Sequence, residues 1–353
     1  MRLILEDGTI FEGKGFGASV PSTGEVVFST GMTGYVESLT DPSFAGQILV
    51  CTYPLIGNYG VPDPSLFESE KIQIAGLVVG EYSQTYSHHE AKRSLDTWLK
   101  ASGVPAITGI DTRALTKKLR ERGVMLGQLC AGKPGEFLDP NRENLVAKVS
   151  PKEIRTYGSG PVRIVAVDCG MKENIIRSLV HDSTTVIRVP WNYDFTQDQY
   201  EALVLGNGPG DPQMCDVTVN HVRKAMKDGK PILGVCLGNQ LLALAAGATT
   251  YKLKYGHRGQ NQPCIEKESG RCYITSQNHG YAVDASTLPN TWDVWFTNGN
   301  DGSVEGIRHK TRPWGSVQFH PEASPGPTDT AWIFDEFIRY VTAQKRIRVH
   351  NHD

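Results

Sequence analysis

One cysteine stands between two glycines where an apolar, β-type run gives way to a helix-type run. In residues 231–247, PILGVCLGNQLLALAAG, Cys236 has Gly234 two positions before it and Gly238 two positions after it. This spacing is typical of a sharp strand-to-helix turn that exposes a nucleophile, with cysteine in place of serine. The turn places the thiol at a helix N-terminus, which favours thiolate, and leaves the backbone N–H of Leu237 free to stabilise an oxyanion. The pattern alone does not decide between a nucleophile and a buried structural cysteine.

A thiol nucleophile needs a base, and the base needs a group that orients it. The segment SVQFHPE, residues 316–322, supplies both, because His320 ends a predicted strand and Glu322 follows two positions later. Side chains at i and i+2 of an extended segment point to the same side, so the carboxylate can reach the imidazole. A lone histidine at a strand end is more often structural, but together with the cysteine turn the pair predicts a Cys-His-Glu triad.

A glycine-rich loop, GNGPGDP at residues 206–212, follows another predicted strand of the same half. It lacks the Gly-Lys-Ser/Thr ending of a P-loop and the spacing of a dinucleotide site, so the loop does not indicate phosphate binding. A rigid turn is one interpretation. The better one is a loop beside the cysteine strand whose backbone amides complete an oxyanion hole.

The segment TSQNHGYAV, residues 275–283, gathers amide, imidazole and aromatic groups around Gly280. In a ligand site, Asn278 and the backbone near Gly280 could hold the charged α-groups of an amino acid. Ordinary hairpin chemistry accounts for the same residues, and the sequence does not choose between the two.

The elements around these motifs alternate between strand and helix in the second half of the chain. Strands with continuous apolar runs between amphipathic helices predict a parallel sheet covered on both faces, with functional groups beyond the carboxyl ends of its strands. The predicted strands cover residues 162–170, 184–190, 200–205, 231–235 and 314–322, and the predicted helices cover 172–182, 219–230, 238–248 and 328–341.

The first half has short strands and glycine turns without regular helical alternation, which predicts a strand-rich α+β domain. Residues 2–13 indicate a hairpin around Asp7–Gly8, and residues 87–103 and 111–123 indicate helices. We therefore expect an α/β protein of two domains, residues 1–155 and 163–345. A Gly-, Ser- and Pro-rich linker is predicted at 156–162 and a basic tail at 346–353.

Charge and composition exclude several classes of protein. The chain has 36 Lys+Arg against 38 Asp+Glu, so no basic excess indicates nucleic acid. No run of about 18 apolar residues predicts a membrane span. The seven cysteines form no C-x-x-C pair and no zinc pattern, so we expect no metal site and reduced thiols in the cytoplasm.

At this point the chain resembles the glutaminase subunit or domain of carbamoyl-phosphate synthetase, within the class I, triad-type glutamine amidotransferases. The resemblance is nearest to the fused pyrimidine-pathway type of eukaryotes. The motifs that carry it are NGPGDP, GVCLGNQLLALAAGA, TSQNHGYAV, QFHPEASPGP, GIDTRALTKKLRERG and TGMTGYVESLTDPSFAGQILVCTYPLIGNYG. One departure is Asn239, where many relatives have histidine.

The resemblance implies a flavodoxin-like amidotransferase domain in the second half and a site for L-glutamine. Cys236 would attack the side-chain amide, His320 would move the proton and Glu322 would orient the imidazole. A γ-glutamyl thioester would form, ammonia would leave and water would release glutamate. The glutamine contacts that carry over are Ser43, Gly208, Gly210, Leu237, Gln240, Asn278, Gly280 and Tyr281.

In this family ammonia passes to a large synthetase subunit or fused synthetase domain, which holds the ATP and Mg²⁺ sites. No cofactor is therefore expected in this chain. Serine at the nucleophile position marks members without glutaminase activity, and this chain has cysteine. The alternatives are an amidotransferase subunit of another pathway and a catalytically silent docking subunit. The sequence leaves open pyrimidine or arginine synthesis, and a separate subunit or part of a longer chain.

Overall fold

The computed structural model describes residues 1–350, and the side chains of residues 1–347. The chain divides into two compact units. The first consists of Met1–Leu145 and Lys254–Gly259, and the second of Val146–Leu253 and Gln260–Asp353.

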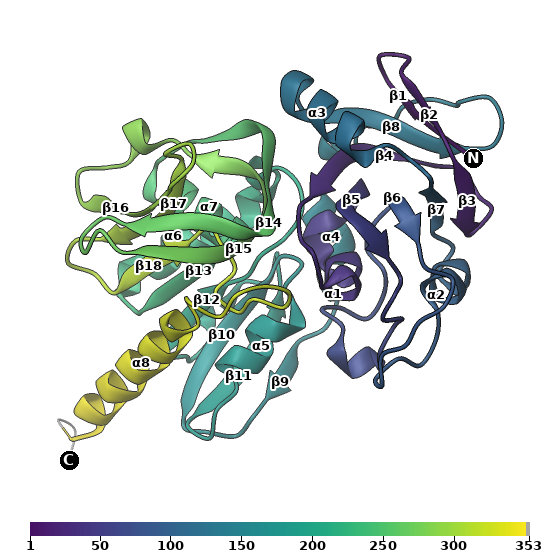
Figure 1. The fold of residues 1–353 in the computed structure, drawn as a ribbon. Coiled ribbons are helices and arrows are strands. Elements are labelled where there is room, and N and C mark those ends of the chain that lie inside the picture. Colours follow the sequence, from purple (N-terminus) through teal and green to yellow (C-terminus); the bar gives the residue numbers. More distant parts are fainter. Residues whose placement is uncertain (351–353) are drawn as a thin grey trace. The chain divides into compact units, whose positions relative to one another are not determined.

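The first unit is built on a mixed sheet of eight strands in the order β2-β1-β8-β4-β5-β6-β7-β3 (Figure 1). The predicted hairpin is confirmed, because β1 pairs antiparallel with β2. The strands are β1 (Arg2–Leu5), β2 (Ile10–Glu12), β3 (Lys14–Gly17), β4 (Ser22–Ser29), β5 (Gln47–Ile56), β6 (Gly76–Tyr82), β7 (Pro105–Thr108) and β8 (Met125–Cys130).

The helices of the first unit begin and end at residues that the sequence marks. They are α1 (Tyr35–Thr40), α2 (Leu95–Ala101) and α3 (Thr112–Arg122). The carboxylate of Asp111 accepts a hydrogen bond of 2.8 Å from the backbone N–H of Ala114 and caps α3. Gly123 ends α3 with φ 102°, a conformation that favours glycine. A short helix, α4 (Leu145–Val149), begins at the last residue of this segment.

The second unit contains a sheet of ten strands in the order β15-β14-β16-β17-β18-β13-β12-β10-β11-β9. The strands are β9 (Arg155–Tyr157), β10 (Val162–Asp168), β11 (Thr184–Pro190), β12 (Ala202–Leu205), β13 (Ile232–Val235), β14 (Thr250–Glu266), β15 (Cys272–Val283), β16 (Trp292–Asn298), β17 (Val304–His309) and β18 (Trp314–Val317). The helices are α5 (Glu173–Leu179), α6 (Asp216–Ala225), α7 (Leu237–Ala246) and α8 (Trp332–His350).

Five of these strands form the predicted parallel sheet. Along the sheet they stand in the order β11-β10-β12-β13-β18, and every neighbouring pair is parallel. Counted along the chain this is the order 2-1-3-4-5, which is the flavodoxin-like order. Separate apolar cores pack on its two faces, one including Leu237 and Leu241 of α7, the other Ile175 of α5 and Phe334 of α8. The predicted fold class is confirmed.

The observed division differs from the predicted domain boundaries. Residues 155–157 form β9, which pairs antiparallel with β11, and the N–H of Gly160 donates to the carbonyl of Thr184 at 3.0 Å. The segment predicted as a linker at 156–162 is therefore held on the edge of the second sheet, where its glycines and proline make the turn into β10. Residues 346–350 of the predicted tail continue α8, and residues 351–353 lie outside the described residues.

Candidate active site

Cys236 stands at the turn between β13 and α7 in a backbone conformation that few residues adopt. Its φ is 55° and its ψ is −104°, and its side chain is almost fully buried. Its N–H donates to the carbonyl of Val317 at 2.8 Å, which fixes the turn to the neighbouring strand β18. Apart from glycine, asparagine and aspartate, few residues adopt a positive φ, and those that do are often strained residues at functional sites.

Neither flanking glycine could carry a side chain, because backbone atoms of neighbouring segments lie too close. A Cβ on Gly234 would lie 2.5 Å from the carbonyl oxygen of Gly238, and one on Gly238 would lie 2.1 Å from the carbonyl oxygen of Leu205. Both distances are shorter than any real contact of a methyl group. The Gly-x-Cys-x-Gly pattern therefore exists because α7 packs directly against the ends of β12 and β13.

His320 and Glu322 lie as the spacing predicts, although the strand before them is shorter than expected. β18 ends at Val317, and His320 is held in extended backbone by an isolated bridge to Ser276, to which it donates its N–H at 2.9 Å. His320 Nδ1 lies 2.6 Å from Glu322 Oε1, and both side chains are buried. His320 Nε2, the other ring nitrogen, is buried without a hydrogen bond to any described atom.

A buried lysine completes this group, and the sequence analysis missed it. Lys172 comes from the turn before α5, and its Nζ lies 3.1 Å from Glu322 Oε1. The same Nζ donates to the carbonyl of Ala323, and the side-chain amide of Asn174 donates to the carbonyl of Glu322. Lys172 from the turn and Asn174 from the first residues of α5 thus hold the segment after His320 through three contacts.

The charges around the triad shift two pKa values in opposite directions. Burial by itself would lower the pKa of His320, but the neighbouring charges of Glu322 and Cys236 outweigh it and raise this pKa to about 10. Burial would raise the pKa of Glu322, but Lys172 and His320 lower it to about 2. The carboxylate is therefore ionised and the imidazole is held in its protonated form at neutral pH.

The thiol of Cys236 lies among amide groups. It donates to the carbonyl of Asn278 at 3.7 Å and accepts from Gln318 Nε2 at 3.7 Å. Gln318 Oε1 in turn accepts from Asn239 Nδ2 at 3.0 Å and from Gln240 Nε2 at 3.2 Å. Asn239, the departure from the family pattern, is fully buried here and also accepts from the hydroxyl of Ser316 at 2.9 Å. Its side chain therefore joins α7 to β18, and its backbone N–H donates to the carbonyl of Cys236 at 3.0 Å.

The glycine loop after β12 lies beside the cysteine turn. β12 and β13 are neighbours, with Leu205 opposite Gly234. A Cβ on Gly208 would lie 2.8 Å from a side-chain carbon of Leu237, and Gly210 has φ 84°. Leu237 is the first residue of α7, where the backbone N–H has no acceptor inside the helix. The loop therefore packs against the Leu237 side chain at the Cys236 end of α7.

Strand β15 supplies the other predicted ligand groups. The carbonyl of Tyr281 accepts from Gln240 Nε2 at 2.9 Å, and the carbonyl of Asn278 accepts from the thiol of Cys236. Gly280 and Tyr281 are partly exposed. Strand β15 and the start of α7 thus share hydrogen bonds, and this edge of the site is open to solvent.

Two family models match the chain, one over each half. "Carbamoyl-phosphate synthase small chain, CPSase domain" matches residues 3–129, and "Glutamine amidotransferase class-I" matches residues 165–340. The chain belongs to the carbamoyl-phosphate synthase small-chain family. Its second unit is the class-I glutamine amidotransferase domain, and the triad lies in that domain.

Relatives of this family member are much longer proteins. Multifunctional protein CAD of Squalus acanthias is 54% identical over 351 residues, which cover 95% of this chain and 16% of the relative. Multifunctional protein URA2 of Saccharomyces cerevisiae is 48% identical over 99% of this chain and 18% of its own length. Carbamoyl-phosphate synthase [ammonia], mitochondrial, of Aquarana catesbeiana is 49% identical over 98% of this chain and 24% of its own length. The chain therefore spans a quarter or less of each of these proteins.

Ser43, the remaining glutamine contact implied by the family, belongs to the first unit. It lies in a short 3₁₀ helix, Pro42–Phe44, where its N–H donates to the carboxylate of Asp41 at 2.9 Å and its side chain is buried. Its contact with glutamine stays a prediction.

Two further observations concern cations and membranes. In the first unit the exposed residues His88, His89 and Glu90 have ligand atoms within 4.8 Å of one another and could take a cation. They are three consecutive surface residues, and the triad uses none of them. Among the residues described, no helix is long and apolar enough to cross a membrane.

Proposed function

We propose that this chain hydrolyses L-glutamine to glutamate and ammonia through a γ-glutamyl thioester on Cys236. The observation that carries the proposal is the arrangement of the triad. Cys236 stands on a strained turn, and His320 offers a buried ring nitrogen that has no hydrogen bond to any described atom, while its other nitrogen is held 2.6 Å from Glu322. This is the geometry of a thiol, its proton acceptor and an orienting carboxylate.

The first half of the reaction forms the thioester. The proton of the Cys236 thiol is held on His320 Nε2, and the sulfur attacks the side-chain amide carbon of glutamine. The N–H of Leu237 and the backbone of the loop at Gly208 and Gly210 stabilise the negative charge on the amide oxygen. His320 then gives the proton to the departing nitrogen, and ammonia leaves.

The second half returns the enzyme to its starting state. His320 accepts a proton from water, the resulting hydroxide attacks the thioester carbon, and the bond to sulfur breaks to give glutamate. Throughout, the charge of Glu322 stabilises the protonated imidazole, and Lys172 stabilises the ionised carboxylate.

Substrate recognition falls to the edge of the site formed by β15 and α7. We assign Asn278, Gly280 and Tyr281 to the α-amino and α-carboxylate groups of glutamine, and Gln240 to the support of this segment through its bond to the Tyr281 carbonyl. Ser43 is proposed as a further contact from the first unit.

The ammonia is proposed to serve a carbamoyl-phosphate-forming synthetase, either a separate subunit or a fused domain that holds ATP and Mg²⁺. The family model over residues 3–129 and the names of the multifunctional relatives support this partner. All seven cysteines are free thiols, which supports a reducing compartment such as the cytoplasm.

A coupled assay of glutamate release tests the proposal. Cys236→Ala should abolish glutamate release, whereas Cys272→Ala, which removes an exposed thiol of the same unit, should leave it unchanged. With a synthetase partner present, Cys236→Ala should retain carbamoyl phosphate synthesis from added ammonia. Equal loss of glutamine-dependent and ammonia-dependent synthesis would contradict the assigned role, and undiminished glutamate release would contradict the nucleophile.

A further inference from the structure

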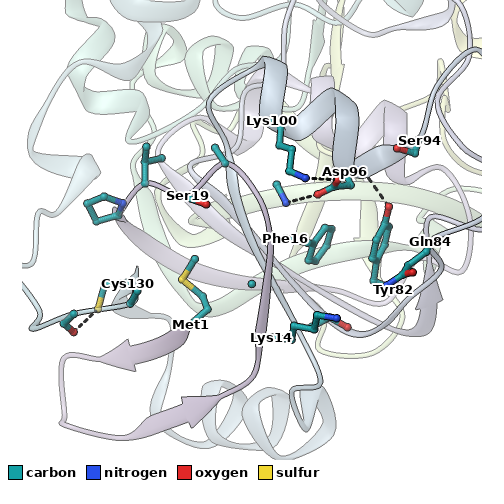
Figure 2. A pocket seen from close by; sticks show the side chains of 18 of the residues that line it. Met1, Lys14, Phe16, Ser19, Tyr82, Gln84, Ser94, Asp96, Lys100 and Cys130 are labelled. Carbon is teal, nitrogen blue, oxygen red and sulfur yellow. Dashed lines mark hydrogen bonds and ion pairs between the residues drawn. The ribbon is translucent and has the colours of Figure 1, made fainter.

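A separate cavity of about 880 Å³ lies entirely within the first unit, which contains none of the triad residues (Figure 2). It is bordered by the edge strand β3, by α2 and by the ends of β6 and β8. Its size falls in the range of small-molecule sites. The side chains that matter for its chemistry are Lys14, Phe16, Tyr82, Asp96, Lys100 and Lys133.

The cavity has a flat aromatic wall. The rings of Phe16 and Tyr82 are stacked, with centroids 4.3 Å apart and planes inclined by 10°. Both side chains are only partly buried, and Figure 2 shows them together among the lining residues. Exposed faces of parallel rings favour stacking of a further planar group.

Hydrogen bonds hold this wall in place before any ligand binds. Asp96 at the start of α2 accepts from the N–H of Gly17 at 2.8 Å, next to Phe16. The N–H of Asp96 donates to the hydroxyl of Tyr82 at 3.3 Å. One residue thus ties both rings to the same helix, and a preorganised wall loses little conformational entropy on binding.

The charges of the cavity leave a positive excess. The carboxylate of Asp96 lies 2.6 Å from Lys100 Nζ, so these two side chains neutralise each other. Lys14 and Lys133 are exposed and make no ion pair with any residue that the structure describes. Two uncompensated ammonium groups beside an apolar wall favour an anion.

We infer that this cavity binds a small anion that carries a planar aromatic ring. The ring stacks on Phe16 and Tyr82, and the anionic group lies within reach of Lys14 and Lys133. The site is independent of glutamine hydrolysis, because none of its residues takes part in that reaction.

Fluorescence titration of the full chain with 1-naphthyl phosphate tests the inference. Saturable binding is expected, weakening as NaCl is raised because the lysines are exposed. 1-Naphthol lacks the charged group and inorganic phosphate lacks the ring, so each should bind at least about fivefold more weakly than 1-naphthyl phosphate. Equal affinity for either one, or no binding at millimolar probe, would overturn the inference.

Variants locate the binding. The double substitution Lys14→Gln and Lys133→Gln should weaken binding by about 25-fold, since an exposed ion pair contributes about fivefold. Phe16→Leu should weaken it while leaving the salt dependence intact. Lys117→Gln, an exposed lysine of α3 outside the cavity, is the matched control and should change nothing. Unchanged affinity for 1-naphthyl phosphate in the double variant would overturn the site.

A ten-residue glutamate peptide distinguishes a small-molecule site from a protein-docking surface. If the peptide binds more tightly than 1-naphthyl phosphate and the double variant loses that binding, the cavity is a protein-docking surface instead.

Discussion

Two buried thiols of the second unit, Cys236 and Cys264, have very different surroundings. Both are almost completely inaccessible to solvent. Cys264 lies in the regular strand β14, where its sulfur accepts from Gln277 Nε2 at 3.2 Å, and burial raises its pKa far above the ordinary range. Cys236 stands on a turn at φ 55°, and its charge acts on a buried imidazole. Burial is common to both, so the backbone turn and the imidazole are the features that distinguish the proposed nucleophile from the other thiol.

Removal of each thiol in turn should give the largest contrast. Cys236→Ala is expected to lower kcat for glutamate release by roughly 10⁴-fold or more, because the covalent step is lost. Cys264→Ala should leave kcat within about twofold and lower the free energy of unfolding by about 1–2 kcal/mol, the effect of a small cavity. Steady-state kinetics and urea unfolding measure both. A comparable loss of kcat in the two variants would break the contrast.

The turn itself can be tested through its second glycine. Gly238 lies in α7, where alanine normally stabilises a helix by about 0.5–1 kcal/mol. Here the new methyl group would meet the carbonyl of Leu205, so Gly238→Ala should destabilise the protein by about 2–4 kcal/mol.

Gly135→Ala is the control for this substitution, since nothing lies within 4 Å of its added methyl group, and its effect should stay within about 0.5 kcal/mol. Urea unfolding compares the two variants. A stabilised Gly238→Ala protein would show that the close approach of α7 to β12 is wrong.

Loss of the orienting charge should have a smaller effect on activity. Glu322→Gln keeps the shape of the side chain but removes the charge that stabilises protonated His320, so kcat should fall roughly 10²-fold. The Glu305→Gln variant, which changes another buried carboxylate of the same unit, should retain far more activity. A Glu322→Gln enzyme as active as the Glu305→Gln enzyme would remove Glu322 from the triad.

The smallest expected effect is the dependence of the free energy of unfolding on pH. The pKa of His320 is raised from 6.5 to about 10 in the folded chain, so its protonation stabilises the fold fully below pH 6.5, and this contribution is lost as the pH rises toward 10. The free energy of unfolding of the wild type minus that of His320→Gln should therefore shrink between pH 6.5 and pH 9.5. Urea unfolding at several pH values measures the difference. A difference that grows with pH would contradict the ion pair.

The sequence predicted those parts of the site that depend on local pattern. The cysteine turn, the spacing of His320 and Glu322 and the parallel strands follow from residues close together in the chain. Lys172 could not be found in this way, because its partner Glu322 is 150 residues away and nothing near Lys172 marks it as buried. Gln318 does have a local signal, since it stands two residues before His320 on the same extended segment.

The segment predicted as a linker at 156–162 shows the same dependence on distant residues. Gly158, Gly160 and Pro161 suit a flexible linker and a tight turn equally well, and only the pairing of β9 with β11 decides for the turn. The composition of a segment indicates only how freely its own backbone can turn. Whether β9 pairs at the edge of the sheet depends on β11, about 30 residues further along the chain.

Acid quenching of the chain during turnover with isotopically labelled glutamine tests the central claim most directly. Mass spectrometry of the digested protein should find a γ-glutamyl group on the peptide that contains Cys236 and on no other cysteine peptide, and the Cys236→Ala protein should carry none. A glutamyl group on Cys264 or Cys272, or steady glutamate release without any labelled cysteine, would contradict the account.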